Sequence, residues 1–209
     1  MDRQKLIENV PFIYHLTDRR NLKFILETKS FFSTKELVNK SNVENKDQII
    51  KKRRPVHCTF IVNENEIWIR DQRPLNAALE KCLTGGWSSE QFIYTLNCRV
   101  FFWPNLKRLK THFERYKNEN PVIFKIELKK ALELNSNAEL CHLNSGATVP
   151  QYLLGGIAPL RGPDTFLSIE KYDKGINNLA EVTFTKSFNL PNGFFISESP
   201  NGNWREQFI

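Results

Sequence analysis

Alternating side chains near the start of the chain predict a strand that is followed at once by a helix. Two sets of side chains alternate over residues 12–17 (FIYHLT), between Pro11 and Asp18, as in a short strand. Apolar residues at helical spacing follow over 22–26, and Thr17 or Asp18 is suited to cap that helix. His15 is therefore expected beside a helix N-terminus, where free amides favour electron-rich ligands. The simpler alternative is a histidine that bonds only to local backbone groups.

A second alternating segment lies near the other end of the chain. Residues 180–185 (AEVTFT) have the period of a half-buried strand with one polar face, and Glu181 lies on that face. A carboxylate at this position either lines a cleft or points into water, as most strand glutamates do. Periodicity alone favours water.

The segments between these two predict a mixture of strands and helices. We expect a hairpin from strands at 56–62 and 66–70, helices at 75–83 and from Ser88 or Ser89 through Leu96, and strands at 100–103 and 122–128. Residues 35–54 are polar with little periodicity, which predicts a mobile loop or a broken helix over the site. No clear element is predicted after Pro191.

Composition favours one domain and a polyanionic partner. The 209 residues, 40% of them apolar, are enough for one substantial core, with a helical insertion expected around 75–120. Thirty basic and 23 acidic side chains give a net charge of +7, which favours a partner such as nucleic acid.

The basic residues gather in two clusters. One is the run 51–54 (KKRR), and the other lies on the helix expected after Pro104, at Lys107, Arg108, Lys110, Arg115 and Lys117. Apolar residues at helical spacing on that helix should face inward and turn the cations outward, where a phosphate backbone would suit them. An ordinary solvated helix face is the alternative for either cluster.

Cysteine and histidine spacing predicts no metal site. The four cysteines form no CxxC pair, and the adjacent pairs at 57–58 and 141–142 are weak signals for zinc. The sequence shows no signal peptide, no apolar stretch long enough to span a bilayer and no disulfide spacing, so we expect a cytoplasmic protein with reduced thiols and no membrane partner.

Several short blocks together resemble the DarT ADP-ribosyltransferases and a bacterial family of unknown function associated with the same fold. These blocks are FIYHLT with NLKFIL, IRDQRPL, LNCRVFFWP, LNSGATVP, RGPDTF and NLAEVTF. Each is short, and the resemblance rests on their order and spacing over most of the chain. It implies an α+β fold with a split, curved β-sheet core surrounded by helices, and NAD as co-substrate without a metal.

The resemblance also implies roles for particular residues. His15 matches a histidine that orients NAD, and Thr17 and Asn21 in the same block are expected to contact NAD with it. Glu181 matches the catalytic glutamate, which binds the nicotinamide ribose. A fixed carboxylate there would stabilise the oxocarbenium-like state that forms as the nicotinamide bond breaks.

The chain departs from the DarT pattern at the arginine. DarT-type enzymes carry this arginine in a Pro-Arg-Ser setting after an aromatic strand, whereas Pro104 here is followed by Asn105. Arg99, then Arg161 and Arg73, are the preferred substitutes, and Arg70 is a further one, because a guanidinium can hold a diphosphate through two hydrogen bonds. A solvated or ion-paired surface arginine is the alternative for each.

We therefore expect an NAD-dependent ADP-ribosyltransferase that modifies a DNA or RNA base. The resemblance implies a role as a toxin or in phage defence, opposed by an antitoxin protein or a hydrolase. An NAD glycohydrolase, a protein ADP-ribosyltransferase and a non-enzymatic nucleic-acid-binding protein remain alternatives. A tRNA 2′-phosphotransferase shares the fold, but its set of histidines and arginines is not identifiable here.

Overall fold

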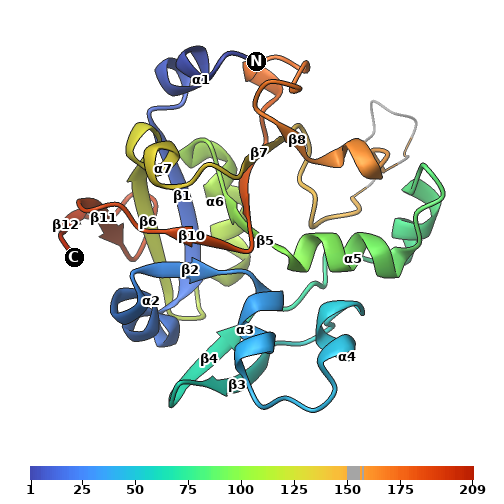
Figure 1. Ribbon diagram of the computed structural model, residues 1–209, viewed down its shortest axis with the longest axis horizontal. Helices are drawn as coiled ribbons and strands as arrows, with labels where there is room; N and C mark the ends of the chain where they lie inside the picture. Colours follow the sequence, from blue (N-terminus) through green and yellow to red (C-terminus); the bar gives the residue numbers. More distant parts are fainter. Residues whose placement is uncertain (150–155, 157) are drawn as a thin grey trace.

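Two four-stranded antiparallel sheets form the centre of the computed structural model, which describes residues 1–149, 156 and 158–209 (Figure 1). The first has the order β1 (Phe12–Asp18), β6 (Pro121–Glu127), β11 (Phe194–Ser197) and β12 (Arg205–Gln207). The second has the order β5 (Arg99–Phe102), β9 (Glu181–Thr185), β7 (Ala138–Cys141) and β8 (Leu167–Ser168). With helices around these sheets, the α+β class expected from the sequence is confirmed.

The two sheets are connected by backbone hydrogen bonds between β1 and the end of β5. Tyr14 and Trp103 exchange N–H to carbonyl bonds of 2.9 and 2.8 Å, which places β1 beside the end of the second sheet. Two-stranded ribbons lie outside the sheets: β2 (Ser30–Phe32) with β10 (Ser187–Asn189), and β3 (Cys58–Val62) with β4 (Asn65–Ile69).

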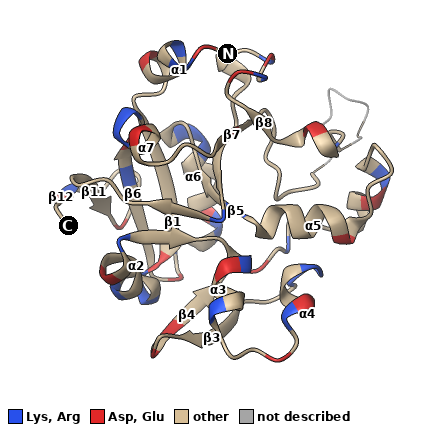
Figure 2. Ribbon diagram, in the orientation of Figure 1, with Lys and Arg blue, Asp and Glu red and all other residues tan. Residues whose placement is uncertain are grey.

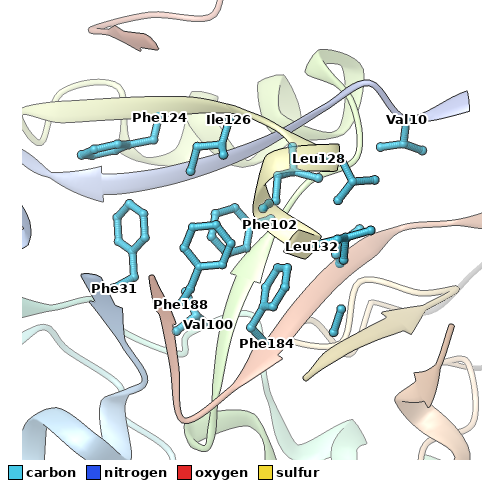
Figure 3. Packing of buried hydrophobic residues seen from close by; sticks show 14 of the residues in the cluster. Val10, Phe31, Val100, Phe102, Phe124, Ile126, Leu128, Leu132, Phe184 and Phe188 are labelled. Carbon is cyan, nitrogen blue, oxygen red and sulfur yellow. The ribbon is translucent and has the colours of Figure 1, made fainter. Parts of the chain in front are cut away.

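Phenylalanines fill the space between the sheets. Phe31, Phe102, Phe124, Phe184 and Phe188 come from five different strands and are at most 3% exposed (Figure 3). Edge-to-face contacts join several of them, for example Phe102 with Phe184 at 5.5 Å between ring centroids. Each such ring stabilises the fold by about 1.5–3 kcal/mol relative to an exposed one, and close packing holds β1, β5 and β9 in fixed relative positions.

The first predicted unit is confirmed. A helix, α1 (Arg3–Asn9), precedes β1, and the turn η1 (Arg19–Asn21) leads from β1 into α2 (Leu22–Thr28). The predicted cap of this helix is wrong, because the N-cap of α2 is Asn21, which makes no side-chain cap bond. The Asp18 carboxylate instead caps η1 by accepting the backbone N–H of Arg20 at 2.9 Å. His15 lies in the middle of β1, three residues before the last residue of the strand, and not at its end.

Residues 35–54 contain two short helices, α3 (Thr34–Lys40) and α4 (Lys46–Ile50). They pack with the β3–β4 hairpin through a small apolar cluster that includes Leu37, Val38, Ile50 and Phe60. The segment is therefore the broken helix of the two predicted alternatives.

The segment 75–120 contains a strand as well as helices. It holds η2 (Ala77–Cys82), a short 3-10 helix within the helix predicted over 75–83, followed by α5 (Ser89–Asn97), β5 and α6 (Leu106–Tyr116). The Ser88 cap is confirmed as a capping box with Gln91. Because β5 pairs with β9, this segment is part of the central sheet and not a purely helical insertion.

The end of the chain corrects the prediction after Pro191. β11 lies in the middle of the first sheet, between β6 and β12, and Phe194 is fully buried. The remaining elements are α7 (Leu128–Leu134), η4 (Pro163–Thr165) and η5 (Ile176–Asn178). Among the described residues, no helix has the length and apolar character needed to cross a bilayer.

Candidate functional site

A cavity of about 290 Å³, open to solvent, brings together both ends of the chain. Its walls come from β1, the end of β4, α6 and the loop after β7. Among its lining residues are His15, Thr17, Trp68, Arg70, Trp103, His112, Tyr116 and Glu181. Aromatic and aliphatic side chains and several charged groups thus share the lining, which is typical of a small-molecule site.

His15 enters the cavity as a neutral ring. Its Nδ1 lies 2.8 Å from the carbonyl oxygen of Phe101, and the ring of Phe31 packs against it at 4.4 Å between centroids. Burial lowers the pKa of His15 to about 4. Because a carbonyl can only accept, Nδ1 must donate, so Nε2 is left as a hydrogen-bond acceptor.

Glu181 begins β9 and is 4% exposed, so the prediction that it points into water is wrong. β9 is buried over residues 181–184 because β5 and β7 pair with it on either side and both faces are covered. One carboxylate oxygen accepts the backbone N–H of Ser145 at 3.1 Å, and the other accepts its hydroxyl at 2.7 Å. Burial raises the pKa of Glu181 to about 7, and the bonds from Ser145 oppose that rise.

Arg161 lies outside the cavity and corrects the expectation that it contacts NAD. It is 2% exposed, and its guanidinium donates to the backbone carbonyls of Asn144, Ala147 and Pro159. Asn144 and Ala147 flank Ser145. Arg161 therefore fastens the loop that holds the carboxylate of Glu181.

Arg99 and Arg73 are both engaged in ion pairs. Arg99 lines the cavity, but it donates twice to Glu139, at 2.7 and 3.2 Å, and once to the carbonyl oxygen of Thr95. Arg73 is not among the lining residues and pairs with Asp71 at 2.9 Å. All three guanidinium nitrogens of Arg99 are thus engaged, and Arg73 lies outside the cavity lining.

Thr17 and Asn21 line the cavity as expected, but the amide of Asn21 already has partners. It accepts from the backbone N–H of Trp68 at 2.8 Å and donates to the Trp68 carbonyl and the Thr17 hydroxyl, at 2.9 and 3.1 Å. Asn21 therefore holds β4 against the start of the chain and fixes the position of Trp68.

Sequence reasoning missed the contribution of α6 to the cavity. The ring of His112 packs between Trp103 and Tyr116 in tilted contacts, at 4.5 and 5.0 Å between ring centroids. Burial lowers the pKa of His112 to about 3. His112 and Tyr116 each lie three residues after a buried apolar residue of the predicted inward face, Leu109 and Phe113. Helical spacing would therefore have placed both side chains near the protein interior.

The two basic clusters differ in the structure. In the run 51–54, Arg54 is buried and donates to Ile49 and Asn97, and Lys51 pairs with Asp47. On α6, Lys107, Lys110 and Arg115 are exposed, and Arg115 also lines the cavity. Figure 2 marks the Lys and Arg positions along the ribbon in blue. Only the α6 cluster therefore forms a cationic face beside the site.

Metal-ligand groups are scattered in this structure. Within 1–149, 156 and 158–209, no three His, Cys, Asp or Glu side chains lie close enough together to hold a metal ion, and all four cysteines are free.

A protein-family model described as "Family of unknown function (DUF7002)" matches residues 11–189. That range includes His15, Arg70 and Glu181. Searches of curated proteins and of solved structures each found no match.

Proposed function

The chain belongs to the DUF7002 family, and we propose that it is an NAD-dependent ADP-ribosyltransferase that modifies nucleic acid. The observation that carries the proposal is that His15 and Glu181, which lie near opposite ends of the sequence, line one cavity. These are the two residues that the resemblance to DarT singles out. The meeting of two sheets at Tyr14 and Trp103 is compatible with the split sheet of that fold.

The chemistry of the cavity suits cleavage of the bond between nicotinamide and ribose. With a pKa of about 7, Glu181 is ionised in a large fraction of molecules at neutral pH. Its carboxylate would stabilise positive charge on the ribose, and a dry site would strengthen that interaction. Nε2 of His15 would accept a hydrogen bond from a ribose hydroxyl, and the aromatic walls would stack on a planar ring.

The proposed acceptor is nucleic acid because the cavity lining reaches the cationic face of α6. Arg115 belongs both to that helix and to the cavity lining, and Lys107 and Lys110 are exposed on the same helix. A phosphate backbone bound there would bring a base close to the reacting ribose. A toxin or phage-defence role, with an antitoxin as partner, is suggested by the resemblance to DarT alone.

Labelled NAD tests the proposal. Wild type and Glu181→Gln are incubated with NAD labelled in the ADP-ribose part and, in separate reactions, with single-stranded DNA, RNA or cell protein. Label in DNA or RNA that appears with wild type but not with Glu181→Gln supports the proposal. Label in protein would show that the acceptor is protein and not nucleic acid. Nicotinamide release without a labelled polymer indicates a glycohydrolase, and no NAD consumption in any reaction overturns the enzyme assignment.

A further inference from the structure

Arg70, directly after β4, brings unpaired hydrogen-bond donors into the cavity. Its Nη2 donates to the carbonyl oxygen of Thr17 at 3.2 Å, while Nε and Nη1 are buried and have no partner among the described residues. The indole N–H of Trp68 is also buried and unpaired. Residues two apart on a strand share a face, and both line the cavity.

The acidic groups near Arg70 are Asp18, Asp71 and Glu119, and each already has another partner. Glu119 lies 3.0 Å from Nε2 of His57. Asp18 binds Arg20 at 2.8 Å, and Asp71 binds Arg73 at 2.9 Å. In the described part of the chain, no carboxylate lies within 4 Å of the Arg70 guanidinium. A guanidinium stays protonated in proteins, so this wall of the cavity has a positive charge without an ion-pair partner.

Aromatic contacts hold the guanidinium in place. It lies over the ring of Tyr116, 4.4 Å from the centroid, and the Trp68 ring is covered on one side by Arg20 at 3.6 Å. Arg70 also contributes to lowering the pKa of both His15 and His112, so its charge is close to both rings. The donors are therefore pre-positioned beside His15, which reduces the ordering needed to bind a ligand.

The arrangement of the free donors favours two acceptor groups over one. Nε and Nη1 lie on different edges of the planar guanidinium, so a single carboxylate does not engage both in a fork. Two linked phosphoryl groups supply acceptor oxygens on both edges, and Arg is well suited to bind them. A ligand rich in acceptors also satisfies the indole N–H of Trp68.

We infer that Arg70 and Trp68 form a subsite for the diphosphate of a nucleotide, at an arginine outside the position that DarT-type enzymes use. The inference deepens the proposed function, on which the choice of a dinucleotide rests. The binding of a diphosphate by these donors does not depend on NAD cleavage, so the two can be tested separately.

Calorimetric titration tests the subsite with ADP, inorganic pyrophosphate, AMP and adenosine. Wild type is expected to bind ADP and pyrophosphate in competition and to prefer ADP to AMP. Arg70→Gln should weaken ADP and pyrophosphate by about tenfold or more and leave adenosine unchanged. Trp68→Phe keeps the stacking ring but removes one donor, so a smaller loss in the same two ligands is expected.

Arg205→Gln is the matched control, because Arg205 is exposed on β12 and does not line the cavity. Arg70→Gln that unfolds at the wild-type temperature yet binds ADP and pyrophosphate unchanged would overturn the inference. If Arg70→Gln is unfolded, Trp68→Phe serves instead: a folded Trp68→Phe variant that binds ADP and pyrophosphate unchanged would overturn the inference. Binding of a short single-stranded oligonucleotide is measured as well. If Arg70→Gln weakens binding of the oligonucleotide but not of ADP, Arg70 binds the phosphates of nucleic acid, and the inference is overturned.

Separate NAD assays distinguish the two proposals. If the protein binds diphosphate through Arg70 but consumes no NAD, the subsite is supported and the transferase proposal is rejected. If wild type consumes NAD but Arg70→Gln does not change the affinity for diphosphate, the transferase proposal is supported and the subsite is rejected.

Discussion

Ser145 donates both its backbone N–H and its hydroxyl to the carboxylate of Glu181, over 3.1 and 2.7 Å. The two bonds fix the orientation of a carboxylate that is almost fully buried. They also stabilise its charged form, which offsets part of the rise in pKa that burial causes. Catalysis by Glu181 is therefore expected to depend on the loop that holds Ser145.

Glu181→Gln should lower NAD cleavage by about a hundredfold or more, because an amide cannot stabilise the developing positive charge as a carboxylate does. The wild-type rate should rise with pH and have its midpoint near 7, since the pKa of Glu181 is about 7 and the ionised fraction grows above it. Nicotinamide release between about pH 5.5 and 8.5 measures both effects. A rate that is independent of pH in this range would contradict the assigned role of Glu181.

Ser145→Ala should move the midpoint of that pH profile to higher pH. The substitution removes the hydroxyl donor, which lowers the pKa of Glu181, but keeps the backbone N–H bond. The charged groups that bear on Glu181 from other elements, Arg161 and Arg108, stay in place. Ser136→Ala, at an exposed position, is the control and should leave the profile unchanged.

Arg161→Met should lower the free energy of unfolding by about 3 kcal/mol, because the carbonyls of Asn144 and Ala147 lose their buried donor. For a chain of this size that corresponds to a melting temperature lower by about 10 °C. Arg3→Met, at an exposed position of α1, should change it by less than about 2 °C. Equal effects of the two substitutions would argue against the fastening role of Arg161.

His112→Phe should make the protein less sensitive to acid. Burial, assisted by Arg70 and Arg115 and opposed by Asp71, lowers the folded-state pKa of His112 to about 3. An unfolded histidine titrates near 6.5, so its contribution to stability is complete above about pH 6.5 and is lost as pH falls towards the folded value. His15, whose pKa is also lowered, likewise makes the fold less stable as pH falls. Glu181, whose pKa is raised, has the opposite effect on stability.

The comparison of His112→Phe with wild type isolates the pH-dependent contribution of His112 to the free energy of unfolding, because Phe keeps an aromatic ring between Trp103 and Tyr116. Between about pH 7.5 and 5, wild type should lose about 2 kcal/mol more stability than the variant. Urea unfolding at the two pH values measures this difference. Parallel losses in both proteins would show that His112 is not held neutral by the fold.

The α6 face should account for much of the nucleic-acid affinity. Neutralising Lys107, Arg108 and Lys110 to Gln should weaken binding and reduce the slope of log affinity against log salt by about 2–3. A charge-matched triple at exposed positions elsewhere serves as control: Arg3, Lys5 and Lys23. If both triples change the slope equally, the effect reflects net charge and not a binding face.

The choice among the arginines could not be made from the sequence. Arg161 and Arg70 have similar local settings, yet one is enclosed by backbone carbonyls and the other presents free donors to the cavity. That difference depends on the loop after β7 and on Tyr116 of α6, which are distant in the sequence. Similarly, Glu181 was correctly placed on a strand, but its burial depends on Ser145 and on both neighbouring strands.

The sequence by itself determined the local elements: the strand and helix around His15, the Ser88 cap, the amphipathic α6 and the strand of Glu181. These follow from side-chain periodicity and capping, which act over a few residues. Only the tertiary structure decided which side chains share the cavity, which charges are paired and which pKa values move. Burial and partner geometry come from contacts between segments far apart in the chain, and periodicity does not encode them.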